Sequence, residues 1–392
     1  MDTLQRGILT LIRSSLTEEA LSLPEGFDLE AAYSQILRHG ISAMAYDGAV
    51  RCGADKRLPV MQKLFQKYLK CMLQDERQTK AAERAFAAFD AAGVEYMPLK
   101  GCNLKRLYPR PELRQMGDAD ILIRMDQYDK IRPIMQNLDF AEKIESDHEL
   151  IWSSPNLLLE LHKRLIPSYN KDYYRYFGDG WQLAKVQNGT RYGMTCEDEY
   201  IYLFVHFAKH YRDGGIGCRH AADLWIWKKA HPQMDEAFIA DELSKLRLLE
   251  FEQNMARTLA VWFEGIEPDE KTQFITDFIF RSGAWGEKDA HVVSAGVKSA
   301  AEAGSAQKGK ALRMCRLLFP SAAEMQNRYP TLKKHPALAP VFWPARWVTA
   351  VLFRRDNIRK KQNELAVVTP DKIESYQQAL NYVGLDFSFK ED

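Results

Sequence analysis

Strand-like sequence is confined to one short part of this chain, and this restricts the available folds more than any other feature. Between about residue 94 and residue 165, the short runs VEYMPL, DADILI, HELIWSS and NLLLELH are strand-like, and DADILI alternates polar and apolar residues. Alternation of this kind is typical of strands. The rest of the chain has the spacing that places apolar residues on one helical face. We therefore predict an α+β fold, with a small mixed sheet flanked by helices.

Helical periodicity occupies both sides of the strand-rich part. N-terminal to it, we expect helices over 3–22, 28–50 and 58–92. C-terminal to it, periodicity returns at Glu197 and continues to about residue 280. The segment 283–309 is rich in Ala, Gly, Ser and Lys, and we expect it to include a mobile stretch before further helices from about 310.

These changes of pattern predict three regions. They are an N-terminal helical region (1–92), a core that contains the sheet (93–195) and a large C-terminal helical domain (196–392). The chain has 392 residues, of which 46% are hydrophobic, and this is long enough for two or three domains with cores of their own.

The overall composition argues against several kinds of partner. Lys and Arg number 54 against 53 Asp and Glu, a net charge of +1, so we expect neither stable nucleic-acid binding nor attraction to anionic membranes. The N-terminus lacks a signal-peptide pattern, and no clean apolar run of about 20 residues is present, which makes a membrane location unlikely. The six cysteines are scattered, as expected for reduced thiols in the cytoplasm.

The acidic pair in DADILI is the first candidate for chemistry. On a strand, Asp118 and Asp120 point to the same face, with their Cα atoms roughly 6.5–7 Å apart. Carboxylates this close repel each other unless a cation lies between them, and hard oxygen ligands favour Mg²⁺ or Mn²⁺. Glu160 interrupts an apolar run where an unpaired carboxylate is costly, so we expect it to be a third ligand. His162 lies on the same face as Glu160.

The sequence LKGCN marks a strand-to-helix turn before this acidic strand. Gly101 can adopt unusual backbone angles, and the N–H groups that follow can hold a triphosphate at the helix N-terminus. Lys100 and Arg114 supply positive charge nearby. Each feature alone also has a structural explanation: a solvated acidic pair, a common turn, and a salt-bridged Glu160. Their order along the chain favours a site for phosphate and metal.

The stretch LKGCNLKRLYPRPELRQMGDADILI, followed by LLLELHKRL, resembles the uncharacterised bacterial nucleotidyltransferases of the DNA polymerase beta superfold. The resemblance covers about residues 30–230 and extends more loosely to about 360. It implies that 93–195 is a nucleotidyltransferase core that uses Mg²⁺ and an NTP such as ATP.

The resemblance also implies roles for individual residues. Asp118 and Asp120 become metal ligands, and Glu160 becomes the third carboxylate and a candidate base for the acceptor hydroxyl. Gly101 and Cys102 take the positions that contact the triphosphate. Cys102 departs from the usual Gly or Ser, and nucleotide affinity depends on whether a backbone N–H or a hydroxyl makes that contact.

A later segment, LFVHFAKHYRDGGIGCRHAADLWIW, is similar to the helical portion of the same family. Lys209 and Arg219 become candidate nucleotide ligands, and Asp223 joins His162 as a candidate for supporting the site indirectly. Two alternatives remain open: Arg219 and Asp223 form a surface ion pair, and His206 and His210 are only packed or solvated.

The expected activity is Mg²⁺-dependent transfer of NMP from an NTP to a hydroxyl of a small molecule, a protein or an RNA end. The last acceptor would suit the toxin of a toxin–antitoxin pair. One alternative is a catalytically inactive nucleotide-binding module, suggested by Cys102. Another is a helical scaffold or membrane-surface protein, suggested by the aromatic and basic residues of 342–361.

Overall fold

The computed structural model describes residues 1–284, 286, 288–304, 306–326, 328–353 and 368–387. The chain divides into two compact units. Unit 1 comprises Met1–Tyr211 and Ile216–Trp285, and unit 2 comprises Arg212–Gly215 and Gly286–Asp392.

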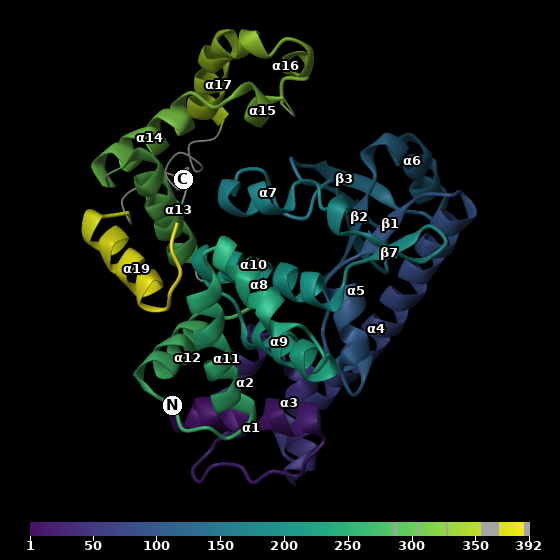
Figure 1. The fold of residues 1–392 in the computed structure, drawn as a ribbon, viewed down its shortest axis with the longest axis vertical. Coiled ribbons are helices and arrows are strands. Elements are labelled where there is room, and N and C mark those ends of the chain that lie inside the picture. Colours follow the sequence, from purple (N-terminus) through teal and green to yellow (C-terminus); the bar gives the residue numbers. More distant parts are fainter. Residues whose placement is uncertain (285, 287, 305, 327, 354–367, 388–392) are drawn as a thin grey trace. The chain divides into compact units, whose positions relative to one another are not determined.

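Helices precede and follow the strands, as the α+β prediction requires (Figure 1). As far as residue 282, the α-helices are α1 (Thr3–Thr17), α2 (Leu29–Arg38), α3 (Ser42–Arg51), α4 (Pro59–Ala91), α5 (Gly101–Leu104), α6 (Tyr128–Asn137), α7 (Lys171–Phe177), α8 (Cys196–Arg212), α9 (Cys218–Ala230), α10 (Glu236–Lys245), α11 (Leu249–Phe263) and α12 (Glu270–Ser282). Short 3-10 helices lie at Lys105–Leu107, Pro111–Leu113, Met125–Gln127 and Trp181–Leu183.

The sheet is mixed and has the strand order β3-β4-β5-β2-β1-β7-β6. Its strands are β1 (Tyr96–Pro98), β2 (Asp118–Ile123), β3 (Ala141–Glu145), β4 (Glu149–Ser153), β5 (Leu158–His162), β6 (Lys185–Asn188) and β7 (Arg191–Gly193). β2 lies at the centre, antiparallel to β1 and parallel to β5. Strands from distant parts of the chain therefore meet at β2.

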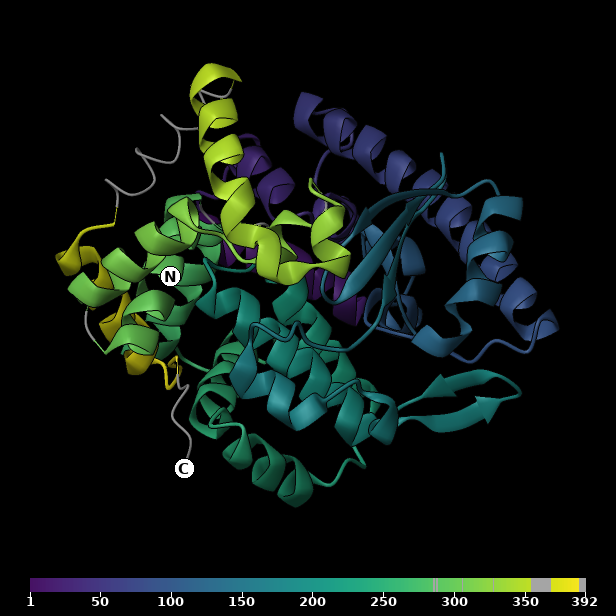
Figure 2. The ribbon, with the colours of Figure 1, turned by 90° about the horizontal axis from the view of Figure 1, so that it is seen from above.

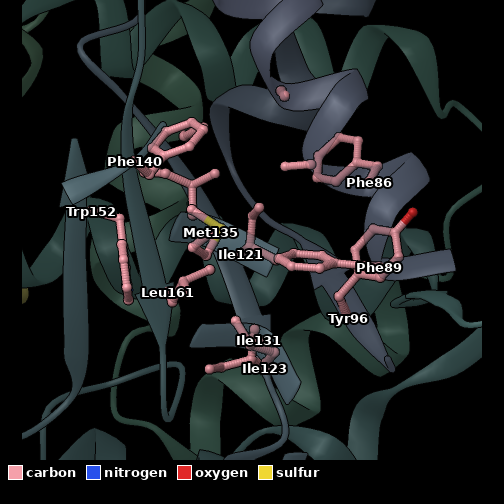
Figure 3. Close-up of a cluster of buried hydrophobic side chains, with 14 of the residues drawn as sticks. Phe86, Phe89, Tyr96, Ile121, Ile123, Ile131, Met135, Phe140, Trp152 and Leu161 are labelled. Carbon is pink, nitrogen blue, oxygen red and sulfur yellow. The ribbon is translucent and has the colours of Figure 1, made fainter. Parts of the chain in front are cut away.

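One face of the sheet packs against α4 and α6. Phe86 and Phe89 of α4 lie against Tyr96, with ring centroids 5.2 and 5.5 Å apart, and Ile121 of β2 is fully buried in the same cluster (Figure 3). The long α4 helix begins with Pro59 in its first turn, where the missing N–H costs nothing. Because this face is closed by apolar contacts, the polar residues that alternate with them lie on the opposite face.

The N-terminal helices are shorter than their periodicity predicts. The first ends at Thr17 rather than at about 22, and 28–50 is two helices instead of one. Between those two helices Gly40 has a φ of +63°, a left-handed conformation that glycine adopts without strain. The apolar spacing continued across this turn, so periodicity alone missed it.

A hairpin formed by β6 and β7 was not predicted. Figure 2 shows it as two teal arrows at the edge of the sheet. Asn188 ends β6 and pairs with Arg191, so Gly189 and Thr190 connect the strands, and Gly189 has a φ of +57°. A glycine at the first position of a two-residue connection is a hairpin signal. However, all four residues of β6 are exposed, so its sequence lacks the apolar alternation used to predict strands.

In unit 2 the helices are α13 (Lys288–Ala303), α14 (Ala306–Leu318), α15 (Ala322–Met325), α16 (Thr331–Lys334), α17 (Ala339–Phe353) and α19 (Pro370–Tyr382), with a 3-10 helix at Pro336–Leu338. Most of the described residues of 283–309, for which we expected a mobile stretch, thus lie in α13 and α14, and the many alanines of this segment favour a helix. None of the helices described is long and apolar enough to cross a membrane. The proposed membrane-surface segment 342–361 lies partly outside the described residues.

Candidate functional site

The acidic face of the sheet is built by two neighbouring parallel strands. In the register of β2 and β5, Asp120 pairs with Glu160, and Leu122 pairs with His162. Side chains alternate along a strand, so Asp118 lies on the same face as these polar residues. Two segments that are 40 residues apart in the sequence therefore bring their polar side chains together, as their two-residue spacing suggested.

Asp120 is the most engaged of these carboxylates. Its Oδ1 accepts a hydrogen bond from Lys100 Nζ at 2.6 Å and lies 2.8 Å from His162 Nε2. Both Asp120 and His162 are buried. The short contact requires His162 Nε2 to carry a proton and donate it, while its buried Nδ1 has no hydrogen-bond partner among the described residues.

A compact set of potential metal ligands lies around this carboxylate. Asp120, Glu160 and His162 each offer one ligand atom, and the three atoms lie within 4.8 Å of one another. Asp118 is not part of this set, although it is close enough to raise the pKa of Glu160. His162, predicted only as a supporting residue, is therefore nearer to the centre of the cluster than Asp118.

The acidic face carries more negative charge than its cationic neighbours balance. Burial, followed by the charges of Asp120 and Asp118, raises the pKa of Glu160 to about 8. Burial and Asp120 also raise the pKa of Asp118. Burial acts in the same direction on Asp120, but Lys100 and His162 outweigh it and hold its pKa below the ordinary value.

This donor set fits a divalent cation. Carboxylate oxygens suit Mg²⁺ or Mn²⁺, and the imidazole of His162 also suits other first-row metals. A cation among these groups would relieve the repulsion that raises the pKa values of Glu160 and Asp118.

The turn before α5 is closely packed. Lys100 has a φ of 45°, unusual for a residue with a side chain. A Cβ atom on Gly101 would lie 2.6 Å from Arg114 Nη1 and 2.9 Å from Met116 Sδ, so a side chain there would displace the ends of these two side chains. The Cys102 N–H donates to Leu99 O at 3.1 Å, and the Cys102 thiol is buried, with its pKa raised to about 12 by burial and by the Asp120 charge.

Glu199 of α8 holds this turn, and the sequence analysis missed it. Its carboxylate accepts from Asn103 Nδ2, at 3.3 and 3.4 Å, and from the backbone N–H of Lys100. Glu199 is only 3% exposed, and burial raises its pKa to about 7. Its spacing of seven residues from His206 was an available signal, because it places both on one helical face.

Glu149 of β4 was also missed. It pairs with His162 across the antiparallel β4–β5 register and contributes to the raised pKa of Glu160. His148 Nε2 lies 3.0 Å from Glu149 Oε2. The strand-like run HELIWSS contained this acid, but strand pairing was needed to place it beside the site.

Arg114, a predicted nucleotide ligand, is part of a buried ion pair. Arg114 Nε and Nη2 each donate to Asp223 at 2.9 Å, and Tyr108 donates to the same carboxylate at 2.7 Å. Asp223 is therefore the buried partner of Arg114, and not the surface partner of Arg219 that its position four residues further along α9 suggested.

The helices α8 and α9 bring further basic side chains toward the acidic face. Arg219 and Lys100 are both close enough to Asp118 to oppose the rise in its pKa. The charges of Lys100 and Lys209 help to lower the pKa of His206. The structure thus brings the predicted residues Lys100 and Arg219 toward the carboxylates, with Lys209 beside His206.

Carboxylates from neighbouring strands, the Lys100 ammonium at one of them and a tight glycine turn are compatible with the binding of a divalent metal and of phosphate groups. The model of a family described as uncharacterised nucleotidyltransferase matches residues 25–264, more than half of the chain. The chain therefore belongs to this nucleotidyltransferase family. Comparison with curated proteins and with solved structures gave no match.

Proposed function

We propose that the protein transfers NMP from an NTP to a hydroxyl acceptor in a reaction that requires Mg²⁺ or Mn²⁺. The observation that supports this most directly is the pairing of Asp120 with Glu160 on adjacent parallel strands, within reach of a common cation. His162 could join them as a ligand through Nε2 once it gives up the proton that it donates to Asp120, and Asp118 lies close enough to add its negative charge. The family match supports the transferase class and an NTP as substrate.

The metal, when bound, would polarise the α-phosphate and stabilise the charge of the departing pyrophosphate. The protein's own groups have distinct roles in this proposal. Lys100, bonded to Asp120, is placed to orient that carboxylate and to attract phosphate oxygens. Glu160, in its ionised form, accepts the proton of the acceptor hydroxyl. Its pKa of about 8 keeps it protonated at neutral pH until another positive charge approaches.

Turnover measurements on charge-neutral variants test the proposal. Asp118→Asn, Asp120→Asn and Glu160→Gln should each reduce pyrophosphate release by about a hundredfold or more, since each lost ligand removes several kcal/mol of charge stabilisation. Asp126→Asn is the matched control, because Asp126 is exposed and lies just beyond β2. Wild-type turnover by Asp118→Asn would contradict the proposal.

The acceptor is identified by following the nucleotide. Each of the four NTPs, labelled on the α-phosphate, is incubated with the protein and Mg²⁺ in a cell lysate. Label on RNA 3′ ends, on protein or on small molecules distinguishes the three acceptor classes, and the first would fit a toxin. The described cysteines are unpaired, which supports a cytoplasmic setting for this reaction.

One observation favours a second candidate, a nucleotide-binding module without turnover. The Cys102 N–H is already used inside the turn, so as the structure stands it is not free to contact a triphosphate. Calorimetry with NTP and Mg²⁺, combined with the turnover assay, separates the candidates. Binding without any product would favour the module.

A further inference from the structure

The acidic face accounts for the metal but leaves a second group of side chains unexplained. Five partly exposed residues of α8 and α9 carry or can carry positive charge, and we call them the basic face. They are His206, Lys209, His210, Arg219 and His220. On α8, positions 206, 209 and 210 interrupt an otherwise buried stretch from Tyr200 to Arg212. Their spacing of three and four residues places them on one side of the helix.

The hydrogen bonds at Arg219 leave donors without acceptors. Arg219 Nη1 donates to Gln115 O, and Nη2 lies 3.2 Å from His220 Nε2. A guanidinium can only donate, so His220 Nε2 must accept, and the ring proton is on Nδ1. That buried Nδ1 and the buried Arg219 Nε both lack a hydrogen-bond partner among the described residues. Two buried N–H groups on adjacent residues therefore lack an acceptor.

A similar need exists on α8. His206 Nε2 and His210 Nε2 lie 3.2 Å apart, so one ring donates to the other. The Tyr202 hydroxyl, one turn before His206, is buried beside the Lys100 ammonium, which can only donate to it, so the hydroxyl proton has no acceptor among the described residues. An unsatisfied buried donor destabilises the fold, so several of them on neighbouring turns indicate a site for a ligand with acceptor oxygens.

The charges around these groups specify what that ligand must be. Burial and then the charges of Lys100 and His210 push the pKa of His206 far below its ordinary value, and burial with Arg219 does the same for His220. Burial and the charge of Arg114 likewise lower the pKa of Arg219. His206 and His220 are therefore neutral N–H donors, and Arg219 supplies positive charge beside them. A multiply charged anion would satisfy both this charge and the donors.

We infer that the basic face binds the β- and γ-phosphates of the NTP, and hence the departing pyrophosphate, with His206, His210, His220 and Arg219 as ligands. The inference rests on the proposed function for the position of the α-phosphate, which must lie at the carboxylates. Asp118 and Asp120 repel the outer phosphates, and the positive charge of the basic face attracts them. Arg219 and Lys100 affect the pKa of Asp118, so the basic face begins beside the acidic one.

Inorganic tripolyphosphate, titrated by calorimetry into the full-length chain with EDTA present, tests this inference without requiring turnover. The wild type should bind one equivalent. The triple variant His206→Gln, His210→Gln, His220→Gln and the single variant Arg219→Gln should each bind at least tenfold more weakly, because a hydrogen bond to a charged group is worth roughly a factor of ten or more. His335→Gln is the matched control, since His335 is exposed in unit 2 and should leave the affinity unchanged.

Asp118→Asn gives a second measurement that does not depend on the histidine variants remaining folded. Removing this carboxylate should leave tripolyphosphate affinity the same or increase it, while abolishing turnover. An affinity that falls with Asp118→Asn would overturn the inference, as would a wild type that does not bind tripolyphosphate. Zn²⁺ binding that requires the three histidines, without tripolyphosphate binding, would also overturn it.

The two proposals fail in distinguishable ways. Tripolyphosphate binding that depends on the histidines, in a protein that consumes no NTP, would refute the transferase proposal and support the phosphate site. Normal NTP turnover with an unchanged KM in the folded triple histidine variant would refute the phosphate site and support the transferase proposal.

Discussion

Replacing Glu160 with Gln should change how the stability of the metal-free protein depends on pH. Burial and the neighbouring Asp120 and Asp118 raise the pKa of Glu160 from 4.5 to about 8. A carboxyl whose pKa is higher in the folded state contributes stability below its unfolded pKa, and that contribution is lost as the pH rises through the folded pKa. The free energy of unfolding of the wild type should therefore fall between about pH 5 and pH 9.

The size of the effect follows from the two pKa values. The difference between 4.5 and about 8 corresponds to roughly 5 kcal/mol in total. Between pH 6 and pH 9, roughly 2–3 kcal/mol of this should be lost. Glu160→Gln cannot ionise at this position, so its unfolding free energy should change less over the same range.

Urea unfolding at several pH values in EDTA measures this difference. The curve for Glu160→Gln should be flatter than that of the wild type, and Glu83→Gln, an exposed position on α4, should match the wild type. Adding Mg²⁺ or Mn²⁺ at pH 8–9 should restore stability to the wild type and much less to Glu160→Gln. Parallel pH profiles for the wild type and Glu160→Gln would refute the electrostatic account of the acidic face.

Three further changes test other parts of the structure. Asp223→Ala leaves the guanidinium of Arg114 buried without its partner and should lower the unfolding free energy, measured in urea, by about 3–5 kcal/mol. The double variant Arg114→Met with Asp223→Leu removes both charges and should recover much of this stability. An equal loss of stability in the single and the double variant would contradict this. His39, whose pKa burial lowers to about 4, stabilises the fold while neutral, so the wild type should lose up to about 3 kcal/mol as the pH falls from 6.5 to 4. His39→Gln should show a flatter acid profile in the same unfolding assay, and an unchanged acid profile would contradict the assignment. Gly101→Ala should reduce kcat/KM for the NTP at least tenfold while the circular dichroism spectrum is retained, because its Cβ would displace the Arg114 side chain; unchanged kinetics would show that the turn tolerates the methyl group.

The local structure around the acidic strand could be predicted closely. DADILI forms β2 with the predicted limits, and Asp118 and Asp120 share one face of it, as the alternation predicted; the structure shows that this face is opposite the apolar core. This succeeded because strand periodicity is a local property. The same reasoning failed at Gly40, where a single left-handed residue divides a continuous apolar pattern into two helices.

Contacts between distant segments were less predictable. The i, i+4 spacing of Arg219 and Asp223 suggested an ion pair, yet Asp223 binds Arg114, which is 109 residues away. His162 was predicted to support the site indirectly, but the parallel pairing of β5 with β2 places it among the three potential metal ligands. A buried carboxylate pairs with the cation that packing brings close to it, and the spacing of residues in the sequence does not show which cation that is.

Because the potential metal ligands come from both β2 and β5, cation binding depends on the register in which these two parallel strands pair. A slip of β5 by one residue would place Leu159 or Leu161 opposite Asp120 and turn Glu160 toward the apolar core. Insertion scanning can use this property. One added residue in the turn at 154–157 should leave the metal affinity intact, whereas one added within β5 should abolish it even where the sheet still forms.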